Sequence, residues 1–153
     1  LPVNLYGPGD NFDLQTSHVI PALIRKCVDA QTHGDDHIVV WGDGTPTREF
    51  LYVDDAARGI LLAAEHYNES NPVNIGAAME ISIRELVHLI ANLCQFEGKI
   101  VWDTSKPSGE PIKVADITRA REILGFAPKV ELVDAIRRTV DWYRANGGRG
   151  GRR

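Results

Sequence analysis

The first dozen residues place a strand-like apolar run directly in front of a turn. The chain opens with LPVNLY over residues 1 to 6, and Gly7-Pro8-Gly9 follows at once. Glycine and proline in this order favour a tight change of direction and leave backbone groups free to meet a ligand. The sequence therefore predicts a strand that runs straight into a ligand-facing loop. Because the chain begins inside this strand, we expect it to be the rear portion of a larger protein, with half of any active site before Leu1.

Composition and charge limit the classes of protein to which the chain can belong. Its 153 residues are 43% hydrophobic and 25% charged, which suits one core of ordinary size. No apolar run approaches the roughly 18 residues of a membrane span, and no signal peptide opens the chain. We therefore expect a cytoplasmic protein without a membrane partner. The net charge of -4 argues against a nucleic-acid partner, because such proteins carry a basic excess.

Three other features are predicted to lie outside the chemistry. Cys27 and Cys94 fall within apolar helical patterns, which favours buried, reduced thiols over a disulfide, a metal pair or a nucleophile. The histidines other than His18 have no partner at metal-ligand spacing, so no metal site is expected. The tail GGRGGRR over residues 147 to 153 cannot build a core and is predicted to be disordered. Residues 1 to 146 are left as the folded unit.

Apolar periodicity and end signals predict most of the helices. Apolar residues recur at helical spacing from residue 19 onward, so residues 18 to 30 should form a helix with Pro21 in its first turn. Thr16, Ser17 or His18 should begin it. Ser82-Ile83-Arg84-Glu85 has the pattern of a capping box in front of a further helix. Residues 118 to 124 should form a short helix stopped by Gly125, and residues 132 to 143 the closing helix.

Short β-branched runs predict the strands. Residues 37 to 42 and residues 48 to 53 should form a pair of strands around a loop, and residues 72 to 76 and 99 to 102 two further strands. Asp54 should cap the helix that follows residue 53. The predicted apolar stripe of that helix consists of Ala57, Ile60, Leu61 and Ala64. Because helices and strands alternate without a repeat, the fold class is α/β or α+β.

The polar residues among these elements suit a site for an anionic small molecule. Arg48 offers a planar fork that can hold a diphosphate with two hydrogen bonds. Lys26, Lys99 and Lys113 could add point charges, although a single lysine is more often a solvated surface residue. Trp41 offers a flat face to a base or sugar ring, and its alternative reading is a core residue. The pattern indicates the class of ligand and not its identity.

His18 is the candidate proton donor. An imidazole exchanges a proton near neutral pH, and general acid catalysis by such a group contributes about 10²- to 10⁴-fold in rate. The alternative is a histidine at a helix N-terminus that hydrogen-bonds locally. Spacing along the chain does not choose between the two.

A series of motifs resembles the nucleotide-sugar epimerases and dehydratases of the extended short-chain dehydrogenase/reductase group. That group shares Asn-Leu-Tyr-Gly-Pro, here at residues 4 to 8, and Arg-Glu-Phe-Leu-x-Val-Asp-Asp, here at residues 48 to 55. Gly-Asp-Asn-Phe-Asp at residues 9 to 13 and Ser-His-Val-Ile-Pro-Ala-Leu at residues 17 to 23 are similar to its GDP-L-fucose synthase branch. The likeness runs in order to about residue 145.

The resemblance implies the C-terminal part of an extended Rossmann-type short-chain dehydrogenase/reductase. This part would comprise the substrate domain and the last elements of the nucleotide-binding sheet. It also implies an enzyme that epimerises GDP-4-keto-6-deoxy-D-mannose at C3 and C5 and reduces its C4 ketone with NADPH, with His18 as the acid. We expect NADP(H) to contact Pro2, Val3, Asn4, Leu5 and His18. We expect the GDP-sugar to contact Asn11, Lys26, Trp41, Arg48, Lys99 and Lys113.

The rest of the family's machinery precedes the matched stretch. The Gly-rich phosphate-binding turn, the Tyr-x-x-x-Lys pair, the catalytic serine and the cysteine base all fall there. The resemblance therefore implies that this chain is inactive and unstable alone, and that the full-length protein is a homodimer. Two rival interpretations are another nucleotide-sugar epimerase or dehydratase, with a different base and sugar, and a noncatalytic sugar-nucleotide binding module.

Overall fold

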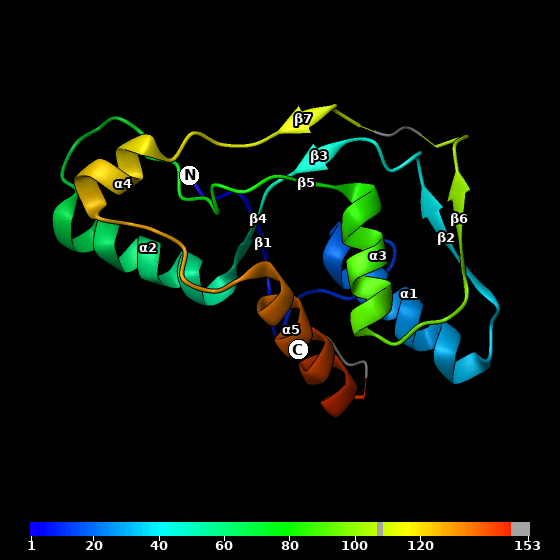
Figure 1. The fold of residues 1–153 in the computed structure, drawn as a ribbon. Coiled ribbons are helices and arrows are strands. Elements are labelled where there is room, and N and C mark those ends of the chain that lie inside the picture. The colour runs from blue at the N-terminus through cyan, green and yellow to red at the C-terminus, as the bar shows by residue number, and fades with distance from the viewer. Residues whose placement is uncertain (107–108, 148–153) are drawn as a thin grey trace.

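Helices and short strands alternate along the chain, as predicted for an α/β protein (Figure 1). The computed structural model describes residues 1–106 and 109–147. The elements are β1 (Asn4–Tyr6), α1 (Val19–His33), β2 (His37–Trp41), β3 (Thr47–Arg48), β4 (Phe50–Tyr52), α2 (Val53–His66), β5 (Ile81–Ser82), α3 (Ile83–Leu93), β6 (Lys99–Asp103), β7 (Ile112–Lys113), α4 (Thr118–Leu124) and α5 (Leu132–Ala145). The tail predicted over residues 147 to 153 lies outside the described residues, apart from Gly147.

The described strands form three small sheets. β1 pairs in parallel with β4, so that Asn4 lies opposite Phe50. β2 pairs in parallel with β6, from His37 opposite Lys99 to Trp41 opposite Asp103. β3 lies between β5, which is antiparallel to it, and β7, which is parallel to it.

The predicted pairing of residues 37 to 42 with residues 48 to 53 is wrong. β2 pairs with β6, and the second run is divided between β3 and β4, which belong to different sheets. The loop between the two runs is held by the start of α3 instead of closing a hairpin. The N–H groups of Ile83 and Arg84 donate to the carbonyls of Pro46 and Gly44, both at 2.9 Å. Composition marked the strands correctly, but the partner of each strand depends on distant segments.

Strand β4 divides the buried side chains into two hydrophobic clusters, where the composition predicted one core. Successive side chains of a strand point to opposite faces, and all three residues of β4 are buried. Phe50 and Tyr52 join the larger cluster, whereas Leu51 joins the smaller one. Helices α1, α3 and α5 contribute to the larger cluster, and α2 and α4 to the smaller one, at the other end of the molecule (Figure 1).

Helices α1 and α3 begin where the sequence predicts. His18 is the N-cap residue of α1, and Pro21 lies in its first turn, where a missing N–H costs nothing. Ser82 and Glu85 form the predicted capping box, with the Glu85 N–H donating to Ser82 Oγ at 3.1 Å and the Ser82 N–H donating to Glu85 Oε2 at 3.0 Å. Each bond satisfies a backbone group that the helix itself cannot.

The two cysteines lie together between these helices. Cys27 of α1 and Cys94, the C-cap residue of α3, are both fully buried and free. The contact with Cys94, together with burial, raises the pKa of the Cys27 thiol. The prediction of buried thiols is confirmed.

Helix α2 differs from the prediction in both its start and its buried face. Tyr52 is the N-cap residue, so Asp54 lies in the first turn and does not cap the helix. The predicted stripe faces outward: Ile60 is 54% exposed and Leu61 63%. The buried side carries Ala56 and Gly59, and a Cβ on Gly59 would lie only 2.7 Å from Ile75. Small residues therefore let the helix approach its neighbours closely, a feature that apolar periodicity does not detect.

The segment over residues 72 to 76 meets the residues before β1 through one bridge, between Pro2 and Ile75, and forms no regular strand. The Val3 N–H donates to Ile75 O at 3.1 Å, and the Ile75 N–H donates to Leu1 O at 2.9 Å. α4 and α5 follow the prediction, and Gly125 ends α4 in the left-handed conformation at φ 61°. None of the helices in the described part of the chain has the length and apolarity needed to cross a bilayer.

The closing helix α5 holds the first loop of the chain in place. Phe12 is 1% exposed, and its ring centroid lies 4.4 Å from that of Tyr143 and 6.1 Å from that of Trp142. Arg25 Nη1 of α1 donates to Phe12 O at 3.1 Å. The loop that precedes His18 is therefore anchored at Phe12 by α1, near the start of the chain, and by α5, near its end.

Asp55 is a buried carboxylate that joins α2 to the segment before α5. Its Oδ2 accepts from the N–H groups of Lys129 and Val130, both at 2.9 Å, and its Oδ1 accepts from Arg58 Nη2 at 2.9 Å. Burial alone would raise the pKa of Asp55, but these three donors outweigh it and lower the pKa below its ordinary value.

We predict that Asp55→Asn destabilises the chain by about 1 to 3 kcal/mol at pH 7, because it leaves a buried donor unpaired. A lowered native pKa contributes stability above the ordinary value of about 3.9 and loses it as the pH falls through the native pKa. The difference from wild type should therefore shrink below about pH 4. Urea unfolding at pH 7 and below about pH 4 measures this difference in the free energy of unfolding. Asp54→Asn, at an exposed neighbour in the same turn, is the control. An equal difference at both pH values would contradict the prediction.

Candidate functional site

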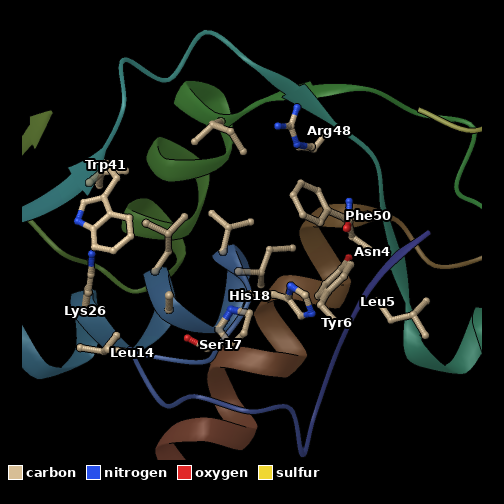
Figure 2. Close-up of a pocket in the computed structure, with 17 residues that line it drawn as sticks. Asn4, Leu5, Tyr6, Leu14, Ser17, His18, Lys26, Trp41, Arg48 and Phe50 are labelled. Carbon is tan, nitrogen blue, oxygen red and sulfur yellow. The ribbon is translucent and has the colours of Figure 1, made fainter. Parts of the chain in front are cut away.

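A cavity of about 400 Å³ opens where β1, the start of α1, β2 and β3 meet (Figure 2). Segments far apart in the sequence supply its walls. The lining residues are Asn4, Leu5, Tyr6, Leu14, Ser17, His18, Val19, Ile20, Pro21, Ala22, Leu23, Lys26, Val40, Trp41, Arg48, Phe50 and Ile83. Six of the predicted ligand residues are therefore brought together: Asn4, Leu5, His18, Lys26, Trp41 and Arg48.

His18 stands at the edge of this cavity. It is the N-cap residue of α1, yet its side chain makes no capping hydrogen bond, so the reading as a locally bonded cap is wrong. The His18 side chain is exposed, and Figure 2 shows its ring at the floor of the cavity beside Tyr6. The imidazole is placed where it can exchange a proton with a bound molecule.

Arg48 lies on the opposite wall from His18 (Figure 2). Its Nη1 donates to Thr47 O and to Glu110 O, both at 2.7 Å. These two bonds hold the planar group at the cavity wall, with its other nitrogens left for a ligand. A fixed fork of this kind suits the oxygens of a phosphate or diphosphate.

Trp41 and Lys26 form the end of the cavity away from Arg48 (Figure 2). Trp41 is 65% exposed, so the reading as a core residue is wrong. Lys106 Nζ lies 5.8 Å from the centroid of the indole ring. Lys26 Nζ donates to Val39 O at 2.7 Å, and partial burial lowers the pKa of this amine. A flat ring beside two cations suits a planar ligand that carries negative charge nearby.

A second groove, of about 690 Å³, adjoins the cavity and shares Asn4, Leu5 and His18 with it. All the residues predicted to contact NADP(H) line this groove, together with Lys113. The complete lining is Leu1, Pro2, Val3, Asn4, Leu5, Asp10, His18, Asn74, Lys113, Val114 and Ala115. His18 therefore stands where two spaces for ligands meet.

Two predicted substrate residues, Asn11 and Lys99, line neither space. The Asn11 amide donates to Thr16 Oγ1 at 2.9 Å, and its Oδ1 accepts from the Asp13 N–H at 3.1 Å, so the side chain shapes its own loop. Lys99 begins β6 opposite His37, roughly 13 Å along the sheet from the Trp41 end at the usual rise per residue. Within the described residues, no group of three or more His, Cys, Asp or Glu side chains lies together as a metal ion would require.

The comparison with known proteins gives the family. A model of the NAD dependent epimerase/dehydratase family matches residues 1–76. The chain is 46% identical over 146 residues to GDP-L-fucose synthase 1 of Arabidopsis thaliana. The match covers 95% of this chain and 45% of the relative. The chain belongs to the NAD dependent epimerase/dehydratase family. It spans less than half the length of this relative.

Solved structures of the same family share the fold. A GDP-L-fucose synthetase from Naegleria fowleri bound to NADP superposes with a TM-score of 0.91 at 34% identity, covering 97% of this chain and 47% of that one. A UDP-glucose 4-epimerase from Thermotoga maritima, solved with UDP-glucose, gives 0.84 at 26% identity, covering 95% of this chain and 45% of that one. The chain thus has the fold of part of a Rossmann-type epimerase.

Several residues of the site were not predicted from the sequence. Ser17 Oγ and Asp10 Oδ2 are buried and have no hydrogen-bond partner among the described residues, and each of the two residues lines one of the two spaces. Burial raises the pKa of Asp10, while the Asn11 N–H and the nearby His18 oppose that rise. Tyr6 and Phe50 complete the wall next to His18. The sequence signal for Tyr6 and Phe50 was their position inside the motifs at residues 4 to 8 and 48 to 55. Neither tyrosine nor phenylalanine marks a site by its residue type alone.

The two lysines Lys26 and Lys99 offer a direct test of this geometry. We predict that Lys26→Met weakens the binding of inorganic pyrophosphate by about tenfold, the equivalent of one charge-assisted bond. Lys99→Met removes the same charge outside the cavity and should leave the affinity unchanged. Isothermal titration calorimetry with the 153-residue chain measures both. Equal losses in the two variants would show that general charge, and not the cavity, attracts the anion.

Proposed function

We propose that this chain forms the substrate-binding, C-terminal part of a GDP-L-fucose synthase. Such an enzyme converts GDP-4-keto-6-deoxy-D-mannose to GDP-L-fucose by epimerisation at C3 and C5 and reduction at C4 with NADPH. The observation that carries the proposal is that His18 and Arg48 line one cavity. A proton donor and a diphosphate fork in the same space are what a nucleotide-sugar epimerase requires.

The cationic residues of the cavity would hold the GDP-sugar by its diphosphate. Arg48 supplies a fixed fork, and Lys26 supplies a compact charge that is already directed by its bond to Val39 O. Trp41 would give the base or a sugar ring a flat surface. Holding the diphosphate together with one of the rings beside it would restrict where the sugar lies, which removes much of the entropic cost of reaction.

His18 would act as the acid of the epimerisation. Inversion next to a ketone needs a base that takes the carbon-bound proton from one face and an acid that returns a proton to the other. His18 would deliver its proton to that second face. The base would come from the part of the protein that precedes this stretch in relatives. The buried phenol Tyr6 and the ring of Phe50 line the same wall and would keep water away from the carbon.

The groove beside His18 fits the nicotinamide end of NADP(H). It is large and shares Asn4, Leu5 and His18 with the cavity, so a ring bound there would adjoin a sugar bound next door. When bound, the cofactor supplies a hydride to the C4 ketone. Pro2, Val3, Asn4 and Leu5 would bind its flat face, and Lys113 would neutralise negative charge near the groove. A cytoplasmic location and a homodimeric full-length protein remain predictions from the sequence.

The proposal is tested by supplying the remaining part of the enzyme. The part of the Arabidopsis thaliana relative that precedes its match to Leu1 is fused to this chain, giving a joined protein. We predict that the joined protein converts GDP-4-keto-6-deoxymannose to GDP-L-fucose with NADPH, whereas the 153-residue chain alone does not. Product formation is followed by chromatography and NADPH oxidation by absorbance. Turnover of UDP-sugars only would favour another epimerase, and GDP binding without turnover would favour a binding module.

We predict that His18→Asn in the joined protein lowers kcat by about 10²- to 10⁴-fold, the usual contribution of a general acid. The affinity for NADPH should change much less. His88→Asn, on the exposed side of α3, is the matched control and should retain wild-type rates. A normal kcat in His18→Asn would contradict the proposal that His18 is the acid.

We predict that Arg48→Lys raises KM for the GDP-sugar by about tenfold, because lysine keeps the charge and loses the fork. It also loses the two bonds to Thr47 O and Glu110 O. Arg137→Lys, at an exposed ion pair with Asp134 on α5, should have no effect. Steady-state kinetics with varied GDP-sugar distinguishes the two outcomes.

A further inference from the structure

Glu49 is a buried carboxylate that has no part in the mechanism above. It lies between β3 and β4 and is 1% exposed. Its Oε1 accepts from the Ala78 N–H at 2.9 Å, and its Oε2 accepts from the Ala115 N–H at 2.7 Å. A charged group is costly to bury unless hydrogen bonds compensate, and here each oxygen is bonded to a different distant loop.

The surrounding backbone is shaped to fit this carboxylate. A Cβ on Gly76 would lie 2.3 Å from Glu49 Oε1, so a side chain at position 76 would displace the carboxylate. Ala78 takes a φ of 55°, in the left-handed region that non-glycine residues seldom adopt. The bond to Glu49 compensates for that conformation. The loop over residues 76 to 78 is thus built around the acid.

Three candidate ligand residues are tied to Glu49. Arg48 precedes it in the chain, and Asn4 Nδ2 donates to its carbonyl oxygen at 3.0 Å. Lys113 lies two residues before Ala115, whose N–H is bonded to its carboxylate. Arg48 lines the cavity, Lys113 lines the groove, and Asn4 lines both. One residue therefore links the walls of both spaces.

We propose that Glu49 is a positioning residue that sets the placement of Arg48, Asn4 and Lys113 relative to one another. The inference rests on the proposed function, because these three residues matter only if they hold the GDP-sugar and the cofactor. Glu49 itself lines neither the cavity nor the groove. Its two bonded loops fix the distance between the cationic wall of the cavity and the groove beside His18.

Glu49→Gln in the joined protein tests this role, with Asp55→Asn as the matched control. Both are buried carboxylates that accept two backbone N–H bonds, but Asp55 holds the loop that starts at Lys129, and neither Asp55 nor Lys129 lines the cavity or the groove. Glutamine keeps the shape and can accept only one of the two bonds. We expect Glu49→Gln to raise KM for the GDP-sugar by about tenfold, a typical effect of a small misplacement, while Asp55→Asn leaves KM unchanged.

Hydrogen exchange provides a readout that does not depend on activity. Because glutamine keeps one acceptor oxygen, at least one of the Ala78 and Ala115 amides should exchange faster in Glu49→Gln, while the Lys129 and Val130 amides keep their wild-type rates. Equal changes in KM in the two variants, or unchanged exchange at both Ala78 and Ala115, would overturn the role of Glu49. If the wild-type joined protein is inactive, the proposed function fails. Pyrophosphate binding by the chain then decides for Glu49, because unaltered affinity in Glu49→Gln would overturn its role and about tenfold weaker binding would support it.

Discussion

The parallel pairing of β1 with β4 is the constraint on which the rest of the structure depends. It lays the first strand of the chain beside residues 50–52 and sets Asn4 opposite Phe50. Both residues line the cavity whose opposite walls carry His18 and Arg48. The same strand sends Leu51 to one hydrophobic cluster and its neighbours to the other. A shift of one residue would exchange the two faces and turn Phe50 away from the cavity that it lines.

Local chemistry explains which parts of the fold could be predicted. The capping box at Ser82, the start of α1 after His18 and the stop of α4 at Gly125 depend on bonds within a few residues, and the structure contains all three. The partner of β2 is β6, whose residues 99–103 are distant in sequence, and the buried face of α2 depends on Ile75 and Phe126, which lie beyond the end of the helix. Apolar periodicity indicates that a helix has an apolar face. In α2 the buried face is instead the one with Gly59, which packs closely against Ile75.

The site shows the same division. Residue type and motif selected His18, Lys26, Trp41 and Arg48, and the structure brings all four to one cavity, while their roles stay predictions. Positive charge also selected Lys99, which begins β6 and lines neither space, because charge alone does not say which end of a strand lies near a cavity. Glu49 escaped notice because a carboxylate in a sequence is taken for a surface group. Its burial, and the hydrogen bonds that it accepts from the distant Ala78 and Ala115 N–H groups, appear only in the structure.

The contacts of Phe12 with Tyr143 and Trp142 make α5 a support of the candidate site, and the helix supplies none of its lining residues. The helix grips the loop that ends at the imidazole, so the orientation of that ring is set partly from the far end of the chain. Engineering should respect this connection. An affinity tag or fluorescent reporter attached directly after α5 can shift this helix. Such a shift would disturb the loop at Phe12 before any other part of the candidate site.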